Sequence, residues 1–89
     1  MDLQQIRLKI DAIDDELVSL LEKRMDMAAK VAQYKKENNI PVYSPTREQE
    51  VLDRLSKKVS DNRIDVITKI YSLLFFQSRN EQENIIQGE

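Results

Sequence analysis

The sequence contains no cysteine and no histidine among its 89 residues. The lack of cysteine excludes disulfides and thiol nucleophiles, and the two absences together exclude the ordinary zinc sites. Histidine is also the commonest general base near neutral pH, so this route to proton transfer is missing. Any chemistry at this protein must therefore use other polar side chains.

Residues that make turns are scarce. The chain has one glycine, Gly88, near its end, and two prolines, Pro41 and Pro45. Sheet folds need more turn residues than this, so the composition predicts an all-α protein. Aromatic residues make up only 6% of the chain and hydrophobic residues 40%, so the core must be mostly aliphatic. A chain of this length is expected to form one small domain.

The chain also lacks a strong excess of either charge. Fourteen basic residues against sixteen acidic ones give a net charge of −2, which argues against a dedicated nucleic-acid-binding domain. The N-terminal segment MDLQQIRLKID has no apolar signal core, and no stretch is suited to spanning a bilayer. We expect a soluble, cytoplasmic protein that binds neither nucleic acid nor membrane.

The segment from Leu3 to Lys36 contains no proline or glycine and carries a heptad pattern. A period close to 3.5 predicts one long amphipathic helix. It is expected to end near Glu37 to Asn39, because Pro41 disfavours helical backbone at the residue before it. The first core position holds Leu3, Ile10, Leu17, Arg24 and Val31, and the second holds Ile6, Ile13, Leu20, Met27 and Tyr34.

Two further helices are predicted. One runs from about Pro45 to about Ser60, with Ser44 as its N-cap, and the other from near Asn62 or Asp65 to about Ile86. The residues expected to face inward are Val51, Leu52, Leu55 and Val59 in the second helix, and Ile67, Ile70, Tyr71, Leu74, Ser78, Gln82 and Ile85 in the third.

The first helix is too long for the rest of the chain to cover. At 1.5 Å per residue it is roughly 50 Å long, whereas a compact domain of this size has a radius of gyration of about 12 Å. Its uncovered apolar stripe must pack on another chain. An intertwined antiparallel homodimer is the simplest solution, because isologous contacts close.

Polar side chains interrupt the stripe of the first helix. Arg24 takes a heptad core position, where an arginine that sets the register or extends to solvent is one interpretation. Lys35 follows eleven residues later and returns to within roughly 20° of the same face, about 16 Å along the axis. Alone it would be read as a solvated lysine, but together the two cations can reach a common ligand.

The other two helices carry polar groups of the same kind. Ser78 and Gln82 lie four residues apart on the inner face of the third helix, where the alternative is a fraying helix end that turns polar. Arg47 and Glu48 begin the second helix. An ordinary solvated ion pair is one interpretation of these two residues. It is disfavoured because Arg47 lies in the first turn, where the helix dipole disfavours a cation.

Together these residues predict a polar pocket in a helical bundle, suited to a small, multiply anionic ligand with a hydroxyl group. Arg7 borders the first stripe seventeen residues before Arg24, about 25 Å along the helix. It cannot easily join the pocket of its own chain, but the Arg7 of a second copy could do so in an antiparallel dimer.

The pieces IRLKIDAIDDELVSLLEKR, AAKVAQYKK, IPVYSPTRE and SRNEQ, in this order and spacing, resemble the all-helical type of chorismate mutase across nearly the full chain. The resemblance implies a single domain over residues 1–89 and a homodimer with two active sites. It assigns carboxylate binding to Arg24 and Arg47, with Arg7 contributed across the dimer. The other implied site residues are Lys35 at the ether oxygen, Glu48 at the substrate hydroxyl, and Ser78 and Gln82 on the last helix.

One position departs from the pattern, because some members of this family carry aspartate where this chain has Ser44. If only the backbone N–H serves the ligand there, serine loses nothing, whereas a required carboxylate would mean weaker hydroxyl binding.

The implied reaction is the rearrangement of chorismate to prephenate, in phenylalanine and tyrosine biosynthesis, without a metal or cofactor. Catalysis then means holding a compact conformer and stabilising charge on the ether oxygen. Alternatives are an isochorismate pyruvate-lyase or an aminodeoxychorismate mutase with the same pocket, or a noncatalytic helical dimerisation module.

Overall fold

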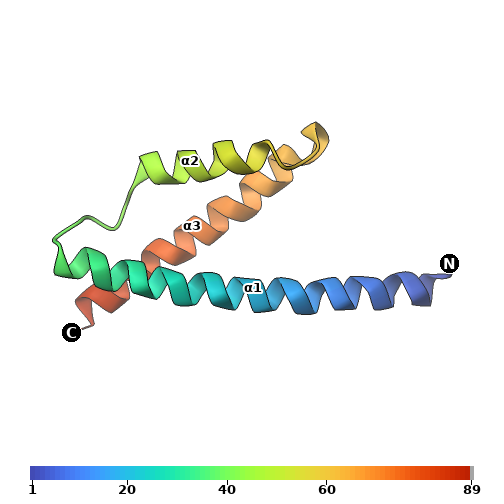
Figure 1. Ribbon diagram of the computed structural model, residues 1–89, viewed down its shortest axis with the longest axis horizontal. Coiled ribbons are helices and arrows are strands. Elements are labelled where there is room, and N and C mark those ends of the chain that lie inside the picture. The colour runs from blue at the N-terminus through green and yellow to red at the C-terminus, as the bar shows by residue number, and fades with distance from the viewer. Residues whose placement is uncertain (89) are drawn as a thin grey trace.

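The computed structural model describes residues 1–88, and every regular element among them is a helix. Three α-helices, α1 (Leu3–Glu37), α2 (Pro45–Ser56) and α3 (Ile64–Gln87), follow one another, with a short 3-10 helix, η1 (Asp61–Arg63), before α3. α3 runs diagonally from the end of α2 to the C-terminal half of α1 (Figure 1). The prediction of an all-α chain with one long and two shorter helices is confirmed.

The ends of α1 are fixed by local hydrogen bonds. Asp2 and Gln5 form a capping box, in which each side chain accepts a hydrogen bond from the other's backbone N–H at 2.9 Å. After Glu37 the backbone of Asn39 turns left-handed, with φ of 55°, and the Ile40 N–H donates back to a carbonyl in the last turn at 2.9 Å. This turn directs the chain away from α1. The helix ends at Glu37, within the range that the sequence predicted.

The second helix is shorter than predicted. It ends at Ser56, four residues before Ser60, although the apolar spacing continues beyond it. The Ser56 hydroxyl donates to the carbonyl of Asp53 at 2.9 Å, and the Lys58 N–H donates to the carbonyl of Leu55 at 2.9 Å. Such three-residue bonds tighten the last turn and end the α-helical pattern.

The core of the single chain is small and lies where α3 crosses the other helices. Among the described residues its buried apolar members are Ala28, Ala32, Val42, Val51 and Phe75. The small alanine side chains allow α3 to approach α1 closely.

The periodicity of α3 predicted one inward stripe, but this helix packs on both α1 and α2. Phe75, which lies outside the predicted stripe, is buried, whereas Ile70 within it remains 49% exposed. A helix placed between two neighbours buries two faces, and a single-stripe prediction misses one of them.

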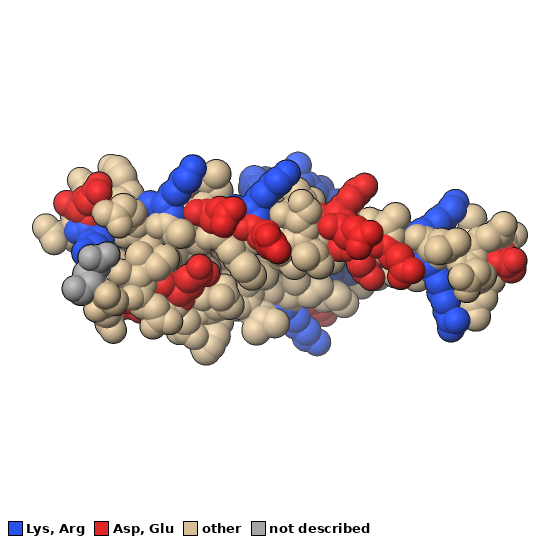
Figure 2. Space-filling model, turned by 90° about the horizontal axis from the view of Figure 1, so that it is seen from below, with Lys and Arg blue, Asp and Glu red and all other residues tan. Residues whose placement is uncertain are grey.

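The N-terminal half of α1 projects beyond the other helices as an arm, defined here as residues 1–20. Every residue of the arm is exposed, and its six heptad core side chains, from Leu3 to Leu20, are between 41% and 62% exposed. Figure 2 shows this narrow arm, with charged side chains of both signs along the molecule. The radius of gyration is 16.3 Å and the longest extent 54 Å, so the single chain is elongated, as its long helix predicted.

No helix of residues 1–88 combines the length and the apolar character needed to cross a membrane.

Candidate functional site

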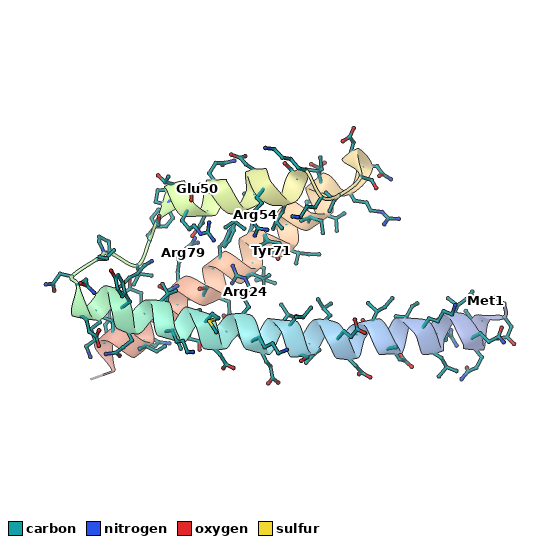
Figure 3. The ribbon with its side chains drawn as sticks, viewed as in Figure 1. Met1, Arg24, Glu50, Arg54, Tyr71 and Arg79 are labelled. Atoms are coloured by element: carbon teal, nitrogen blue, oxygen red, sulfur yellow. The ribbon has the colours of Figure 1, made fainter. Side chains whose placement is uncertain are left out.

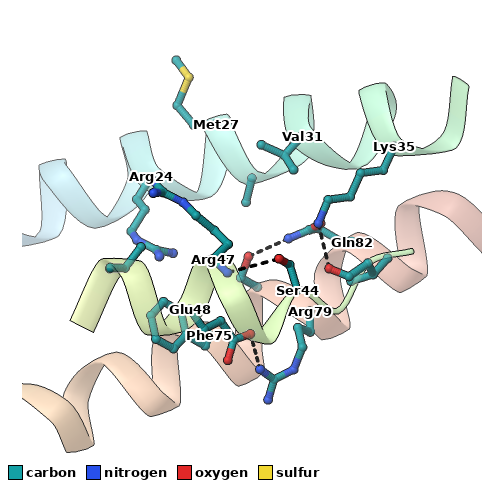
Figure 4. Close-up of a pocket in the computed structure, with 14 residues that line it drawn as sticks. Arg24, Met27, Val31, Lys35, Ser44, Arg47, Glu48, Phe75, Arg79 and Gln82 are labelled. Atoms are coloured by element: carbon teal, nitrogen blue, oxygen red, sulfur yellow. Dashed lines mark hydrogen bonds and ion pairs between the residues drawn. The ribbon is translucent and has the colours of Figure 1, made fainter. Parts of the chain in front are cut away.

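A pocket of about 280 Å³ lies between the C-terminal half of α1, the start of α2 and the C-terminal half of α3. This volume is suited to a ligand smaller than a typical drug molecule. Figure 4 shows polar side chains from all three helices pointing into it. Its charged and polar lining residues are Arg24, Lys35, Ser44, Arg47, Glu48, Ser78, Arg79 and Gln82.

α1 supplies two cations, and both have partners that position them. The Lys35 ammonium donates to the backbone carbonyl of Val42 at 2.7 Å, which leaves two of its three donors for a ligand. The Arg24 guanidinium carbon lies 5.7 Å from the ring centroid of Tyr71 and 5.8 Å from that of Phe75. Cation–π contacts of this kind hold a guanidinium at a half-buried position without using its hydrogen-bond donors.

α2 presents Arg47 and Glu48 from its first turn. The hydroxyl of Ser44 caps this turn by accepting a hydrogen bond from the Arg47 N–H at 3.2 Å. The Arg47 side chain is 66% exposed and lies 3.7 Å from Glu50, which is 60% exposed. Such exposed pairs contribute little, so Arg47 is free to turn toward an anion in the pocket.

α3 contributes Ser78 and Gln82 from successive turns. The Gln82 Nε2 donates to the Ser78 hydroxyl at 2.9 Å. Gln82 is only 7% exposed, and its Oε1 is buried with no hydrogen-bond partner among the described residues. An unsatisfied buried acceptor costs about 1–3 kcal/mol, so the pocket contains a polar group that a ligand or a rearranged amide would satisfy.

Arg79 was missed at the level of sequence. It forms an ion pair with Glu48, and its guanidinium carbon lies 5.1 Å from the ring centroid of Tyr43. The only signal was its place next to Ser78 in the SRNEQ motif. Its partner Glu48 is 31 residues away, so no local periodicity links the two.

Arg7 does not line the pocket of its own chain. It lies exposed on the arm, whereas Figure 3 shows Arg24 and Arg79 in the space between the helices, far from Met1 at the opposite end of α1. The other seven predicted site residues all line the pocket.

The pocket is strongly positive although the chain is weakly negative. Arg24, Lys35, Arg47 and Arg79 contribute four positive charges and Glu48 one negative charge, a local net charge of +3. Such a field attracts small dianions and favours their transfer out of water. Within residues 1–88 no group of acidic side chains is arranged to hold a metal ion.

Comparison with known proteins identifies the family. The sequence profile described as chorismate mutase type II matches residues 6–83, well over half of the chain. The chain belongs to this family. Family membership confirms the resemblance noted in the sequence and the predicted enzyme class, an isomerase.

Curated relatives of the chorismate mutase family cover most of the chain. A chorismate mutase of Methanocaldococcus jannaschii is 31% identical over 87 residues, covering 96% of this chain and 88% of that protein. A 4-amino-4-deoxychorismate mutase of Streptomyces venezuelae is 24% identical over 90 residues, covering 99% and 87%. A bifunctional chorismate mutase/prephenate dehydratase of Aquifex aeolicus is 36% identical over 61 residues, covering 65% of this chain and 17% of that protein. No solved structure matches the chain significantly.

Proposed function

We propose that this protein converts chorismate to prephenate, by an intramolecular Claisen rearrangement that leads to phenylalanine and tyrosine. The observation that carries the proposal is the convergence of Arg24, Lys35, Arg47, Glu48 and Gln82 on one small pocket in a chain of the type II chorismate mutase family.

The reaction suits a chain without cysteine or histidine, because it needs neither a nucleophile nor a proton shuttle. In chorismate the carbon–oxygen bond of the enolpyruvyl ether breaks while a carbon–carbon bond forms in the same molecule, and nothing is exchanged with the protein. The protein must bring the two ends of the substrate together and stabilise the negative charge that grows on the ether oxygen. Guanidinium, ammonium and amide groups are sufficient for both tasks.

The proposed roles follow from charge and position. Arg24 and Arg47 bind the two carboxylates, since guanidinium groups match carboxylates in two-point hydrogen bonds. Lys35 uses its remaining N–H groups to donate to the ether oxygen. Glu48 accepts a hydrogen bond from the substrate hydroxyl. Ser44 offers its backbone N–H to the ligand, while its own hydroxyl caps α2.

Gln82 completes the set at the ether oxygen. Its Nε2 donates to the Ser78 hydroxyl through one of its two N–H groups, and the second N–H donates to the ether oxygen of the substrate. Because the amide is neutral, its donor is present at any physiological pH.

An intertwined antiparallel homodimer is part of the proposal. The arm exposes the apolar core positions of five turns of helix, which a second copy of the arm would cover. The antiparallel arrangement would bring Arg7 of the second copy to the pocket, where it joins Arg24 and Arg47 at the carboxylates. The single domain over residues 1–89 and the cytoplasmic location expected from the sequence also belong to this proposal.

The test is the loss of the ultraviolet absorbance of chorismate on addition of purified protein, with NMR to identify the product. Prephenate formation supports the proposal. Pyruvate release from isochorismate would instead indicate a lyase, and faster turnover of 4-amino-4-deoxychorismate would assign the substrate of the Streptomyces venezuelae relative. If the protein turns over none of the three substrates, the remaining interpretation is a noncatalytic helical dimerisation module.

A further inference from the structure

Arg79 connects two walls of the pocket. Its Nη1 donates to Oε2 of Glu48, which ties α3 to the first turn of α2. The two side chains are half-buried, at 32% and 23% exposed, so the pair is better shielded from water than the Arg47–Glu50 pair. The ring of Tyr43 contacts the guanidinium from a further side. Figure 4 shows the Arg79–Glu48 ion pair as a dashed line at the edge of the pocket.

The ion pair occupies only part of Glu48. An ionised carboxylate has two oxygens and about four acceptor positions, and Arg79 is bonded to Oε2. No described residue donates to the other oxygen, Oε1. Glu48 is therefore held in place by one oxygen while the other remains able to accept a hydrogen bond from a ligand.

The pair also sets the charge that a ligand meets at this wall. Without Arg79, Glu48 would present a net negative charge and would attract an ammonium group more strongly than a hydroxyl group. With Arg79 bound, the charge of the pair is zero, and the guanidinium repels a second cation placed beside Glu48. A neutral hydroxyl donor suffers no such repulsion.

We infer that Arg79 is a positioning and specificity-determining residue, which holds Glu48 as a hydrogen-bond acceptor and makes the pocket favour a substrate with a hydroxyl over one with an ammonium group at the same position. The inference rests on the proposed function, because Glu48 is there assigned to the substrate hydroxyl. It predicts that this protein prefers chorismate to 4-amino-4-deoxychorismate.

The test measures kcat and KM for both substrates in the wild type, Arg79→Gln and Arg79→Lys. We expect Arg79→Gln to lower the ratio of kcat/KM for chorismate to that for 4-amino-4-deoxychorismate at least about tenfold, and Arg79→Lys to restore most of the ratio. Arg54→Gln is the matched control, because Arg54 is exposed on α2 and lies outside the pocket lining. An equal loss on both substrates, or a wild-type preference for the amino substrate, would overturn the inference.

A double-mutant cycle separates this idea from a general loss of packing. In a Glu48→Gln background, Arg79→Gln should no longer change the substrate ratio, because the carboxylate on which Arg79 acts is gone. An undiminished change in that background would contradict the inference. Tyr43→Leu should lower the ratio less than Arg79→Gln, and Tyr43→Phe should keep it, which provides a milder variant if Arg79→Gln folds poorly.

Failure of the proposed function has a different signature. If the wild type turns over neither substrate, the proposed function is wrong, and urea unfolding of the same four proteins of the cycle still tests the pair. If the losses of unfolding free energy in the two single variants do not sum to the loss in the double variant, the result supports a formed Arg79–Glu48 pair. Additive stabilities would show that Arg79 does not hold Glu48.

Discussion

Replacing Lys35 by alanine separates catalysis from folding in this chain. The Lys35 ammonium reaches the pocket from α1 and donates to the carbonyl of Val42, so the substitution removes a hydrogen bond of the fold and a proposed donor to the ether oxygen. The two losses have different sizes, and both can be worked out from the structure.

The structural loss is small. A net hydrogen bond contributes about 1 kcal/mol, and the open pocket allows water to reach the carbonyl of Val42 once the ammonium is gone. For a domain of this size, that corresponds to a fall in Tm of no more than about 4–8 °C. Alanine also favours helix slightly more than lysine, which offsets part of the loss in α1.

The catalytic loss is large. Removing one preorganised donor from a developing oxyanion typically lowers kcat by about 100- to 1,000-fold, equivalent to about 2.7–4 kcal/mol. We therefore expect Lys35→Ala to lower kcat at least about a hundredfold while the helical circular dichroism signal persists. Stopped assays of chorismate consumption, together with thermal unfolding, measure both effects on one sample.

Lys30→Ala is the matched control, because it makes the same substitution on an exposed side chain of the same helix, outside the pocket lining. It should leave kcat within about twofold of the wild type. Near-normal turnover of Lys35→Ala would refute the role assigned to the ammonium. A loss of activity that merely tracks unfolding would show that Lys35 supports the fold rather than the chemical step.

Three further predictions concern the dimer, the buried amide and the helix cap. Mixing inactive Arg7→Ala and Lys35→Ala proteins, with subunit exchange confirmed by mass spectrometry, should restore about a quarter of wild-type activity, because half of the dimers are mixed and each has one intact site. Sedimentation of the wild type should show twice the chain mass, and a stable active monomer, or no recovery after exchange, would reject the shared site. Gln82→Leu should lower kcat at least about a hundredfold with little change of stability in urea, because losing the hydrogen bond to Ser78 is offset by removing a buried oxygen that has no partner; a marked loss of stability would show that the amide supports the fold. Ser44→Ala should destabilise the protein by about 0.5–2 kcal/mol in urea and Ser44→Asp should not, since both serine and aspartate cap a helix; equal stability of all three would mean that the cap contributes nothing.

The sequence was sufficient for the features that depend on local pattern. The absence of proline and glycine and the heptad repeat predicted α1 over its whole length. The interruptions at Arg24 and Lys35, and at Ser78 and Gln82, predicted polar residues that the structure places on one pocket. These predictions succeed because the residues on one face of a helix recur at a fixed spacing along the chain.

The features that the sequence did not reveal depend on contacts between distant segments. Phe75 is buried because α3 lies between two helices. A periodicity that assumes one buried face does not predict the second. The role of Arg79 depends on Tyr43 in a loop and on Glu48 in another helix. The early end of α2 reflects the competing bond of Ser56, although Val59 continues the apolar spacing.

The small core has a consequence for folding thermodynamics. Among residues 1–88 only five apolar side chains are buried within one chain, and one of the most buried polar groups, Gln82, is incompletely hydrogen-bonded. In the proposed dimer, covering the arm would supply much of the apolar burial, so folding and association would be one equilibrium. The population of folded protein would then depend on its concentration by mass action, and dilution would unfold the chain rather than release a folded subunit.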